Sequence, residues 1–205
     1  MRFHIVGVLL SLLLNALLRM AWIETIDEDD ATDALADVYE RIGSTRGKVA
    51  NIMKVHSLRP DTMQAHSDLY RTLLFARTDL SRAERELIAV VVSDANDCAY
   101  CVAHHRAALD AYWKDADRID AVLNRDAKAA ALSEREQALV SYSRLLTTAP
   151  NSVTEAHVDE LRDAGLSDQA ILDTALVASY FNFVNRTALG LGVSFTPEEA
   201  KGYSY

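Results

Sequence analysis

Hydrophobic residues along this chain recur mainly at three- and four-residue intervals, the spacing of a helix with one apolar face. Leu35, Val38, Tyr39 and Ile42 follow it in the segment 24–42. Strict alternation of apolar and polar residues, which would indicate half-buried strands, is scarce. The 205 residues include only three prolines and seven glycines, so few positions interrupt a helix. The pattern predicts an all-α protein with a substantial core.

Three predicted helices begin with the same dipeptide. Leu-Ser stands at 80–81, 132–133 and 166–167, and at the first two positions a Glu follows three residues after the Ser. A Ser followed by Glu at this spacing is the capping box, which marks a helix start. The repeated start predicts an internal duplication, with the second half as a degenerate copy that builds the core and the subunit interface.

The remaining pattern predicts the other elements by the same criteria. One of these helices starts near Pro60. The segment 181–186 is otherwise apolar, so its polar groups need partners from an interface or from the wall of an active site. We expect a helix over 24–42 with Asp30, Thr32 or Asp33 as its cap, a loop over 43–47, short helices over 49–57, 116–124 and 154–164, a connector over 126–131, and a tail over 194–205 that a neighbouring subunit would order.

The segment 86–105 combines a buried helix with a sharp break. Residues 87–92 are apolar almost all round, so the helix that starts after Ser81 is expected to be buried. The polar run 93–97 predicts a turn, with Asn96 or Asp97 as the N-cap of a second helix. If the two helices fold back on each other, Glu86 and His105 lie side by side.

This hairpin carries the chemistry. Cys98 and Cys101 are the only cysteines, and they form a C-x-x-C with His105 one helical turn further on. With Cys98 near N1 and Cys101 near N4, the positive helix end favours thiolate, so at least one thiol should have a lowered pKa. The spacing also allows the pair to close a disulfide. Glu86 can hold one nitrogen of His105 while the other faces the thiols.

These residues are also compatible with other roles. Structural zinc needs four ligands, so His105 and Glu86 would have to complete such a site. Covalent haem needs His directly after the second cysteine, where Val102 stands, which excludes it. Two inert buried cysteines are a further alternative. His104 is a second-choice base, and Met53, His56 and His66 could line a pocket, although packing or surface roles are commoner for such residues.

At this point the residues carry a resemblance. Glu86, then eleven residues, then Cys98-x-x-Cys101-x-x-x-His105, resembles the core motif of the alkyl hydroperoxidase D-like family in the carboxymuconolactone decarboxylase superfamily. The segment NDCAYCVAHH is most similar to the peroxidase-related branch of that family, and the resemblance extends over about residues 21–193. It implies an all-α AhpD-like helical bundle assembled as a trimer or hexamer, acting as a peroxidase without metal or organic cofactor.

The resemblance also implies roles for the four residues. Cys101 would be the peroxidatic thiolate and would become a sulfenic acid, and Cys98 would resolve it as a disulfide. His105, oriented by Glu86, would accept and return protons. An external dithiol reductant, a thioredoxin-like or lipoyl-type protein, would regenerate the thiols. This chain departs from alkyl hydroperoxidase D itself at Tyr100, which stands where that protein has a His.

Composition and charge bear on the partners, the domain organisation and the localisation of this protein. The net charge is −9 and no basic stripe or nucleic-acid motif is present, so nucleic acid is not an expected partner. We expect a single domain over 20–205, preceded by the hydrophobic extension 1–19. Its apolar run 5–18 is short for a membrane span, which needs about 20 residues. We interpret it as a mis-assigned start before Met20, with a signal or anchor and an extra helix as alternatives, and we expect a cytoplasmic protein.

Two other functions remain compatible with the motif. A thiol–disulfide oxidoreductase or redox sensor would use the same cysteines but turn over peroxide slowly, and Tyr100 in place of the family His favours this version. A non-redox carboxymuconolactone decarboxylase-like enzyme would not need both cysteines, so it would keep its activity when Cys98 and Cys101 are replaced.

Overall fold

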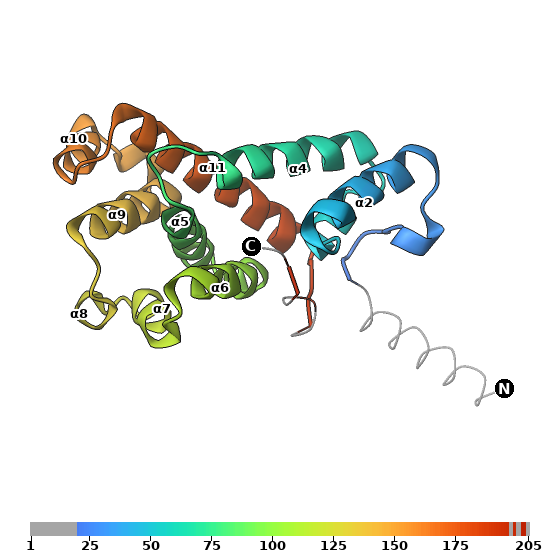
Figure 1. The fold of residues 1–205 in the computed structure, drawn as a ribbon, viewed down its shortest axis with the longest axis horizontal. Coiled ribbons are helices and arrows are strands. Elements are labelled where there is room, and N and C mark those ends of the chain that lie inside the picture. Colours follow the sequence, from blue (N-terminus) through green and yellow to red (C-terminus); the bar gives the residue numbers. More distant parts are fainter. Residues whose placement is uncertain (1–19, 197–198, 200–201, 204–205) are drawn as a thin grey trace.

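The computed structural model describes residues 20–196, 199 and 202–203, so the expectations for residues 1–19 lie outside the described residues. Every regular element in this described part is a helix, which confirms the predicted all-α fold (Figure 1). In chain order the elements are η1 (Glu28–Asp30), α2 (Asp33–Arg46), α3 (Asn51–Lys54), α4 (Pro60–Phe75), α5 (Arg82–Ala95), α6 (Ala99–Trp113), α7 (Ala116–Leu123), α8 (Ala127–Ala130), α9 (Glu134–Thr148), η2 (Pro150–Ser152), α10 (Glu155–Asp163) and α11 (Asp168–Gly190).

Helix α5 is the central element of the bundle. It packs against α6, α9 and α11 (Figure 1). Residues 87–92 are fully buried, as their all-round apolar character predicts. Helix α5, which precedes the cysteines, is therefore fixed in place by neighbouring helices on several sides.

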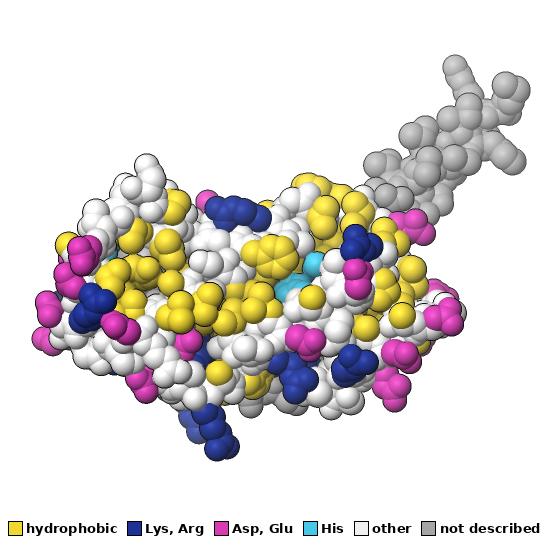
Figure 2. Space-filling view, turned by 90° about the horizontal axis from the view of Figure 1, so that it is seen from above, with side chains coloured by type: hydrophobic (Ala, Val, Ile, Leu, Met, Phe, Trp, Pro, Cys, Tyr) yellow, Lys and Arg dark blue, Asp and Glu magenta, His cyan; other side chains and the backbone are white. Residues whose placement is uncertain are grey.

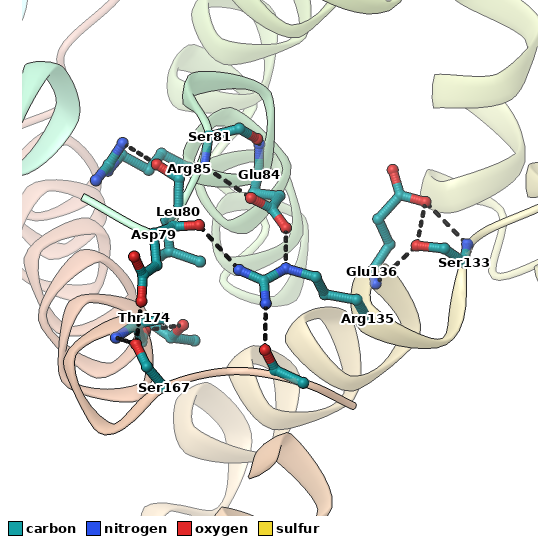
Figure 3. A network of polar contacts seen from close by, with 12 residues as sticks. Asp79, Leu80, Ser81, Glu84, Arg85, Ser133, Arg135, Glu136, Ser167 and Thr174 are labelled. Atoms are coloured by element: carbon teal, nitrogen blue, oxygen red, sulfur yellow. Dashed lines mark hydrogen bonds and ion pairs between the residues drawn. The ribbon is translucent and has the colours of Figure 1, made fainter. Parts of the chain in front are cut away.

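The three Leu-Ser helix starts meet at one end of the bundle (Figure 3). Ser81 and Ser133 form the predicted capping boxes with Glu84 and Glu136, and Ser167 caps α11. In addition, a single side chain joins these starts. The Arg135 guanidinium donates from Nε to Glu84 Oε1 (2.6 Å), from Nη2 to the Asp79 carbonyl (3.0 Å) and from Nη1 to the Gly165 carbonyl (2.9 Å).

Several predicted boundaries were wrong. The first helix begins after Thr32, which confirms one of the three predicted caps but not the start at residue 24, and it continues through the predicted loop to Arg46. The hydroxyls of Ser44 and Thr45 donate to the Arg41 carbonyl one turn earlier, so these residues follow the helix instead of ending it. The helix ends where Gly47 adopts the left-handed conformation, at φ 85°.

One further expectation also needs correction. The predicted connector 126–131 contains the short helix α8, because the Asp126 side chain accepts from the Ala129 N–H and caps it. The described part of the tail packs on its own chain. The Ser194 N–H donates to the Met20 carbonyl at 2.9 Å, and Glu199 contacts His104 at 2.8 Å.

Within the described residues, no helix combines the length and the apolar content that crossing a bilayer requires.

Candidate active site: the cysteine pair and its cavities

The turn between α5 and α6 sets the position of both cysteines. Asn96 closes α5, Asp97 adopts a left-handed conformation (φ 54°), and Cys98 itself is the N-cap of α6. The prediction that Asn96 or Asp97 would cap α6 was therefore wrong, because both residues are used to close the preceding helix. Cys98 lies at the N-cap and Cys101 at N3, one position earlier than expected for each, so both lie within the first turn of α6.

The Glu86–His105 contact predicted from the hairpin is present. His105 Nδ1 lies 2.7 Å from Glu86 Oε2, and the carboxylate is completely buried. Arg82 donates to the other carboxylate oxygen at 2.8 Å from Nε and 2.5 Å from Nη2. Since a carboxylate only accepts, His105 carries a proton on Nδ1, and Nε2 is left for other partners.

The charge of Glu86 is maintained against its burial. Burial by itself raises the pKa of this carboxyl, but His105 and Arg82 outweigh it and hold the pKa below its ordinary value. The Phe181 ring packs edge-on against the His105 ring at 4.5 Å between centroids. Glu86 thus remains an anion that orients the imidazole, and Phe181 packs against the same ring.

Cys98 and Cys101 are both free thiols, each about 1% exposed. The Cys101 thiol hydrogen-bonds to Cys98, and this bond lowers the pKa of Cys98 to about 7. Bonding to Cys98 and burial raise the pKa of Cys101. The predicted lowered pKa is therefore found, at Cys98. Near neutral pH the Cys98 thiol is therefore within the range where it ionises, whereas Cys101 remains a thiol.

The two cysteines line different cavities. Cys101 lines a cavity of about 80 Å³, whereas Cys98 lines a second, more open one of about 280 Å³. The first is walled by His105 and mostly apolar or aromatic residues, among them Met53, Tyr70, Tyr100, Tyr180, Phe181 and Val184. The second is walled by Asp97, Ala99, Tyr100, Ala188, Leu189, Val193, Ser194 and Phe195. The pair can therefore be approached from two directions.

A chain of side-chain amides orients a donor toward Cys101. Arg186 donates to Asn182 Oδ1 (2.7 Å), and Asn96 Nδ2 donates to the same oxygen (3.1 Å) and to Asn185 Oδ1 (2.9 Å). Because Asn185 Oδ1 is an acceptor, its Nδ2 donates, to Ser93 Oγ at 3.2 Å and to Cys101. The bond from Asn185 acts to lower the pKa of Cys101.

Sequence reasoning flagged the polar residues in 181–186 but did not assign Asn185 to the site. The partners of Asn182 and Asn185 come from within the chain: Asn185 bonds to Asn96 and Ser93, and Asn182 bonds to Thr147. Asn185 could be singled out only by its polarity in an apolar helix.

Tyr100, at the position of the family His, has its hydroxyl bound to groups other than the thiols. Its hydroxyl accepts from the Ile52 N–H at 3.0 Å and lies 3.4 Å from Glu199 Oε1. His104 places Nδ1 2.8 Å from the Tyr100 carbonyl and Nε2 2.8 Å from Glu199 Oε2. Both side chains are thus bound to the C-terminal segment, although both also border the cavity at Cys101.

Of the three residues considered as pocket walls, Met53 borders the Cys101 cavity. His66 lies behind this wall and contacts Tyr180, and His56 contacts His66. In the part of the chain that the structure describes, no group of three or more His, Cys, Asp or Glu is arranged to hold a metal ion.

Comparison with known proteins agrees with this geometry. The model of the carboxymuconolactone decarboxylase family matches residues 60–140, which include the whole cysteine hairpin. No curated protein sequence matches the chain. The family resemblance of the motif is thereby confirmed.

Solved structures share the whole fold. A peroxidase-related protein from Ralstonia eutropha JMP134, described as an alkylhydroperoxidase AhpD core, has a TM-score of 0.79 at 27% identity over 88% of this chain and 95% of its own. A peroxidase-related protein from Silicibacter sp. TM1040 has a TM-score of 0.79 at 28% identity over 89% and 95%. The debrominase Bmp8 has a TM-score of 0.72 at 19% identity over 90% and 98%, which shows the shared fold alone.

Proposed function

We propose that this chain, which belongs to the AhpD-like group of the carboxymuconolactone decarboxylase superfamily, is a thiol-dependent peroxidase for hydrogen peroxide or organic hydroperoxides. The observation that carries the proposal is the cavity at Cys101. It brings one thiol of a hydrogen-bonded pair together with a histidine that a buried carboxylate orients. The similarity to two peroxidase-related proteins supports it, and such turnover would serve antioxidant defence.

The reaction begins with a proton shift inside the pair. Cys101 passes its proton to the Cys98 thiolate and becomes the thiolate that faces the cavity. It attacks the terminal oxygen of the hydroperoxide and breaks the O–O bond, which leaves a sulfenic acid on Cys101 and an alkoxide. His105 in its protonated form gives the Nε2 proton to the alkoxide, while Glu86 stabilises the cation.

The second step closes the disulfide. The Cys98 sulfur attacks the Cys101 sulfenic sulfur, its proton joins the departing hydroxide, and water leaves. One hydroperoxide and two thiol-level sulfurs thus give one alcohol, one water and one Cys98–Cys101 disulfide. The position of both cysteines within the first turn of α6 and their mutual effect on pKa support this step.

An external dithiol then restores the pair. We propose that this reductant, a thioredoxin-like or lipoyl-type protein, attacks Cys98, because Cys98 lines the more open cavity of about 280 Å³. Substrate and reductant would then enter from separate sides. The need for such a donor favours a reducing compartment, and we propose the cytoplasm.

We also propose that the chain is a homo-oligomer, a trimer or hexamer. Figure 2 shows a band of hydrophobic side chains on the face seen from above. Along α11, Leu172, Leu176 and Phe183 are 57%, 42% and 48% exposed, and Leu69 on the adjacent α4 is 46% exposed. Exposed apolar side chains grouped in this way are typical of an interface between subunits.

A thiol–disulfide exchange protein is the second candidate. Two observations favour it: the Tyr100 hydroxyl is bound to Ile52 and Glu199, and the lowered pKa lies on Cys98, which borders the more open cavity. Such a protein would exchange readily with a partner disulfide and react with peroxide only slowly.

The test is a count of free thiols in the reduced protein before and after one equivalent of cumene hydroperoxide. We expect a rapid fall from two thiols to none, sulfenic acid that can be trapped in Cys98→Ser, and no reaction in Cys101→Ser. Thiols that survive peroxide but react quickly with an oxidised dithiol would support exchange instead. Activity that persists in the Cys98→Ala, Cys101→Ala double variant would indicate non-redox, decarboxylase-like chemistry.

A further inference from the structure

A hydrogen-bonded chain of four side chains leads away from the wall of the Cys101 cavity. Tyr180 lines that cavity, and its hydroxyl lies 2.7 Å from His66 Nε2. His66 Nδ1 lies 3.1 Å from His56 Nε2, and His56 Nδ1 lies 3.1 Å from Thr62 Oγ1. The Thr62 hydroxyl donates to the Arg59 carbonyl at 2.8 Å. The mechanism above uses none of these groups.

The protons on these groups decide which side chain donates and which accepts in each of these hydrogen bonds. Burial lowers the pKa of His56, and burial together with His56 lowers that of His66 to about 3, so both rings are neutral and each has one N–H. If the protons point away from the cavity, Tyr180 donates to His66, His66 to His56, and His56 to Thr62. Every proton then has an acceptor, and the last acceptor is a carbonyl.

The opposite direction leaves one proton without a partner. Thr62 would donate to His56, His56 to His66, and His66 to the Tyr180 oxygen. The Tyr180 proton would then have no acceptor among the described residues, although the side chain is only 5% exposed. An unpaired buried donor costs about 1–3 kcal/mol, so the outward direction is preferred.

The outward direction changes what Tyr180 offers a ligand. A phenol has one proton and two acceptor lone pairs. Since His66 takes the proton, only the lone pairs remain for the cavity. The other phenol groups on the wall are placed differently. Tyr100 and Tyr203 are bound to Glu199, and Tyr70 interacts with Arg82, a donor. Tyr180 is thus the phenol on this wall whose proton a neutral histidine takes.

We propose that the Tyr180 oxygen is the binding site for the O–H of the hydroperoxide, and that His66 and His56 hold it in this acceptor state. The inference rests on the proposed peroxidase function and adds a substrate-recognising residue to it. Tyr180 contacts the substrate, whereas His66 and His56 are positioning residues that act through it.

This assignment fits the bonds that change in the reaction. The terminal hydroperoxide oxygen carries the hydrogen and is the atom that Cys101 attacks. Its O–H bond survives, because the oxygen is transferred with its hydrogen to become the sulfenic acid. The Tyr180 oxygen can therefore accept the same hydrogen bond in the substrate and in the sulfenic acid. The proton that the alkoxide needs still comes from His105. Oxidants without an O–H on the transferred atom would gain nothing from Tyr180.

The first test measures directly in which direction the hydrogen bonds between Tyr180 and Thr62 are donated. Nitrogen-15 NMR of the reduced full-length protein distinguishes the two neutral histidine tautomers. We expect His56 and His66 both to carry the proton on Nδ1. Protons on Nε2 of both rings would overturn the proposal, because Tyr180 would then be a donor to the cavity.

The second test compares two thiol reactions in Tyr180→Phe. We expect the rate constant for oxidation by cumene hydroperoxide to fall about tenfold, the effect of one hydrogen bond. Alkylation of Cys101 by iodoacetamide, followed on the Cys101 peptide by mass spectrometry, involves no O–H on the reagent and should be unchanged. Tyr142→Phe, which removes a buried phenol that does not border the cavity, should change neither rate.

The outcomes separate this inference from the proposed function. A wild-type protein that reduces no hydroperoxide would overturn both. Wild-type reduction with no loss in Tyr180→Phe, or with equal losses in oxidation and alkylation, would overturn the inference alone. In His66→Leu, checked for folding by its melting curve, the Tyr180 proton is released toward the cavity, so we expect the same selective loss of oxidation.

Discussion

Replacing Glu86 by Gln tests the centre of the proposed site. The carboxylate accepts from Arg82 on one oxygen and from His105 Nδ1 on the other, and it is completely buried. Glutamine has one oxygen and one NH₂ group, so it can satisfy only one of these two donors. If its oxygen faces Arg82, its NH₂ faces His105 Nδ1. The ring must then move its proton to Nε2, the nitrogen on which the mechanism depends.

Two magnitudes follow from this geometry. Breaking a buried ion pair costs about 3–5 kcal/mol, and Gln keeps one of the hydrogen bonds, so we expect a loss near the lower value, about 3 kcal/mol. A domain of this type has a free energy of unfolding of about 5–15 kcal/mol, so the variant should still fold. The wrong tautomer removes proton transfer by His105, which contributes about 10²–10⁴-fold, so we expect thiol oxidation to slow by at least about 100-fold.

The assays are urea unfolding followed by circular dichroism at a fixed protein concentration, and stopped-flow oxidation by cumene hydroperoxide. Glu84→Gln is the matched control. It lies on the same helix and also loses an arginine partner, Arg135, but it lies outside the cysteine site. We expect Glu84→Gln to lose stability without losing oxidation rate. Wild-type oxidation in Glu86→Gln, or equal slowing in both variants, would refute the role assigned to Glu86.

The stability difference should also depend on pH in one direction. The folded-state pKa of Glu86 lies below its unfolded value, because His105 and Arg82 outweigh burial. Its ionised form therefore stabilises the fold above the unfolded pKa of about 4.3, and this contribution is lost as the pH falls through the folded pKa. The gap between wild type and Glu86→Gln should thus be full near neutrality and narrow at acid pH.

Three further predictions follow from the structure. The Cys98 thiol should be alkylated by iodoacetamide with a midpoint near pH 7, and Cys101→Ala should raise this midpoint toward about 8.5, because the donor to the thiolate is lost. Asn185→Ala should cost about 1–3 kcal/mol in urea unfolding and slow oxidation of Cys101, since Asn96 and Ser93 lose their partner. Leu176→Glu should lower the mass measured by light scattering to that of one chain without loss of helix content.

Much of the fold was predictable because its signals are local. The capping boxes at Ser81 and Ser133 involve atoms three residues apart, and the all-round apolar run 87–92 predicted the buried helix. The Glu86–His105 contact was predictable as well, although the residues are nineteen positions apart. The polar run between them allows one tight turn, and the register of two helices about a tight turn follows from counting.

Local signals were ambiguous at some ends of helices. Gly43 to Gly47 has the composition of a loop, but Ser44 and Thr45 bond to the preceding turn and remain helical. Asn96 and Asp97 are good N-cap residues, yet they close α5, and Cys98 takes the cap position. The end of α5 and the start of α6 can both use the same polar residues, and the local sequence does not show which of the two helices they cap.

The amino-acid sequence alone therefore determined the class of fold, the helix that carries the cysteines and the four residues at the centre of the proposed chemistry. Tertiary packing decided what surrounds them. It placed Cys101 and Cys98 in different cavities, turned Asn185 toward Cys101, and joined Tyr180 to His66 from 114 positions earlier in the chain. The physical reason is range. Helix periodicity and capping depend on neighbours within a turn or two, whereas these contacts depend on how α11 packs against α4 and α6.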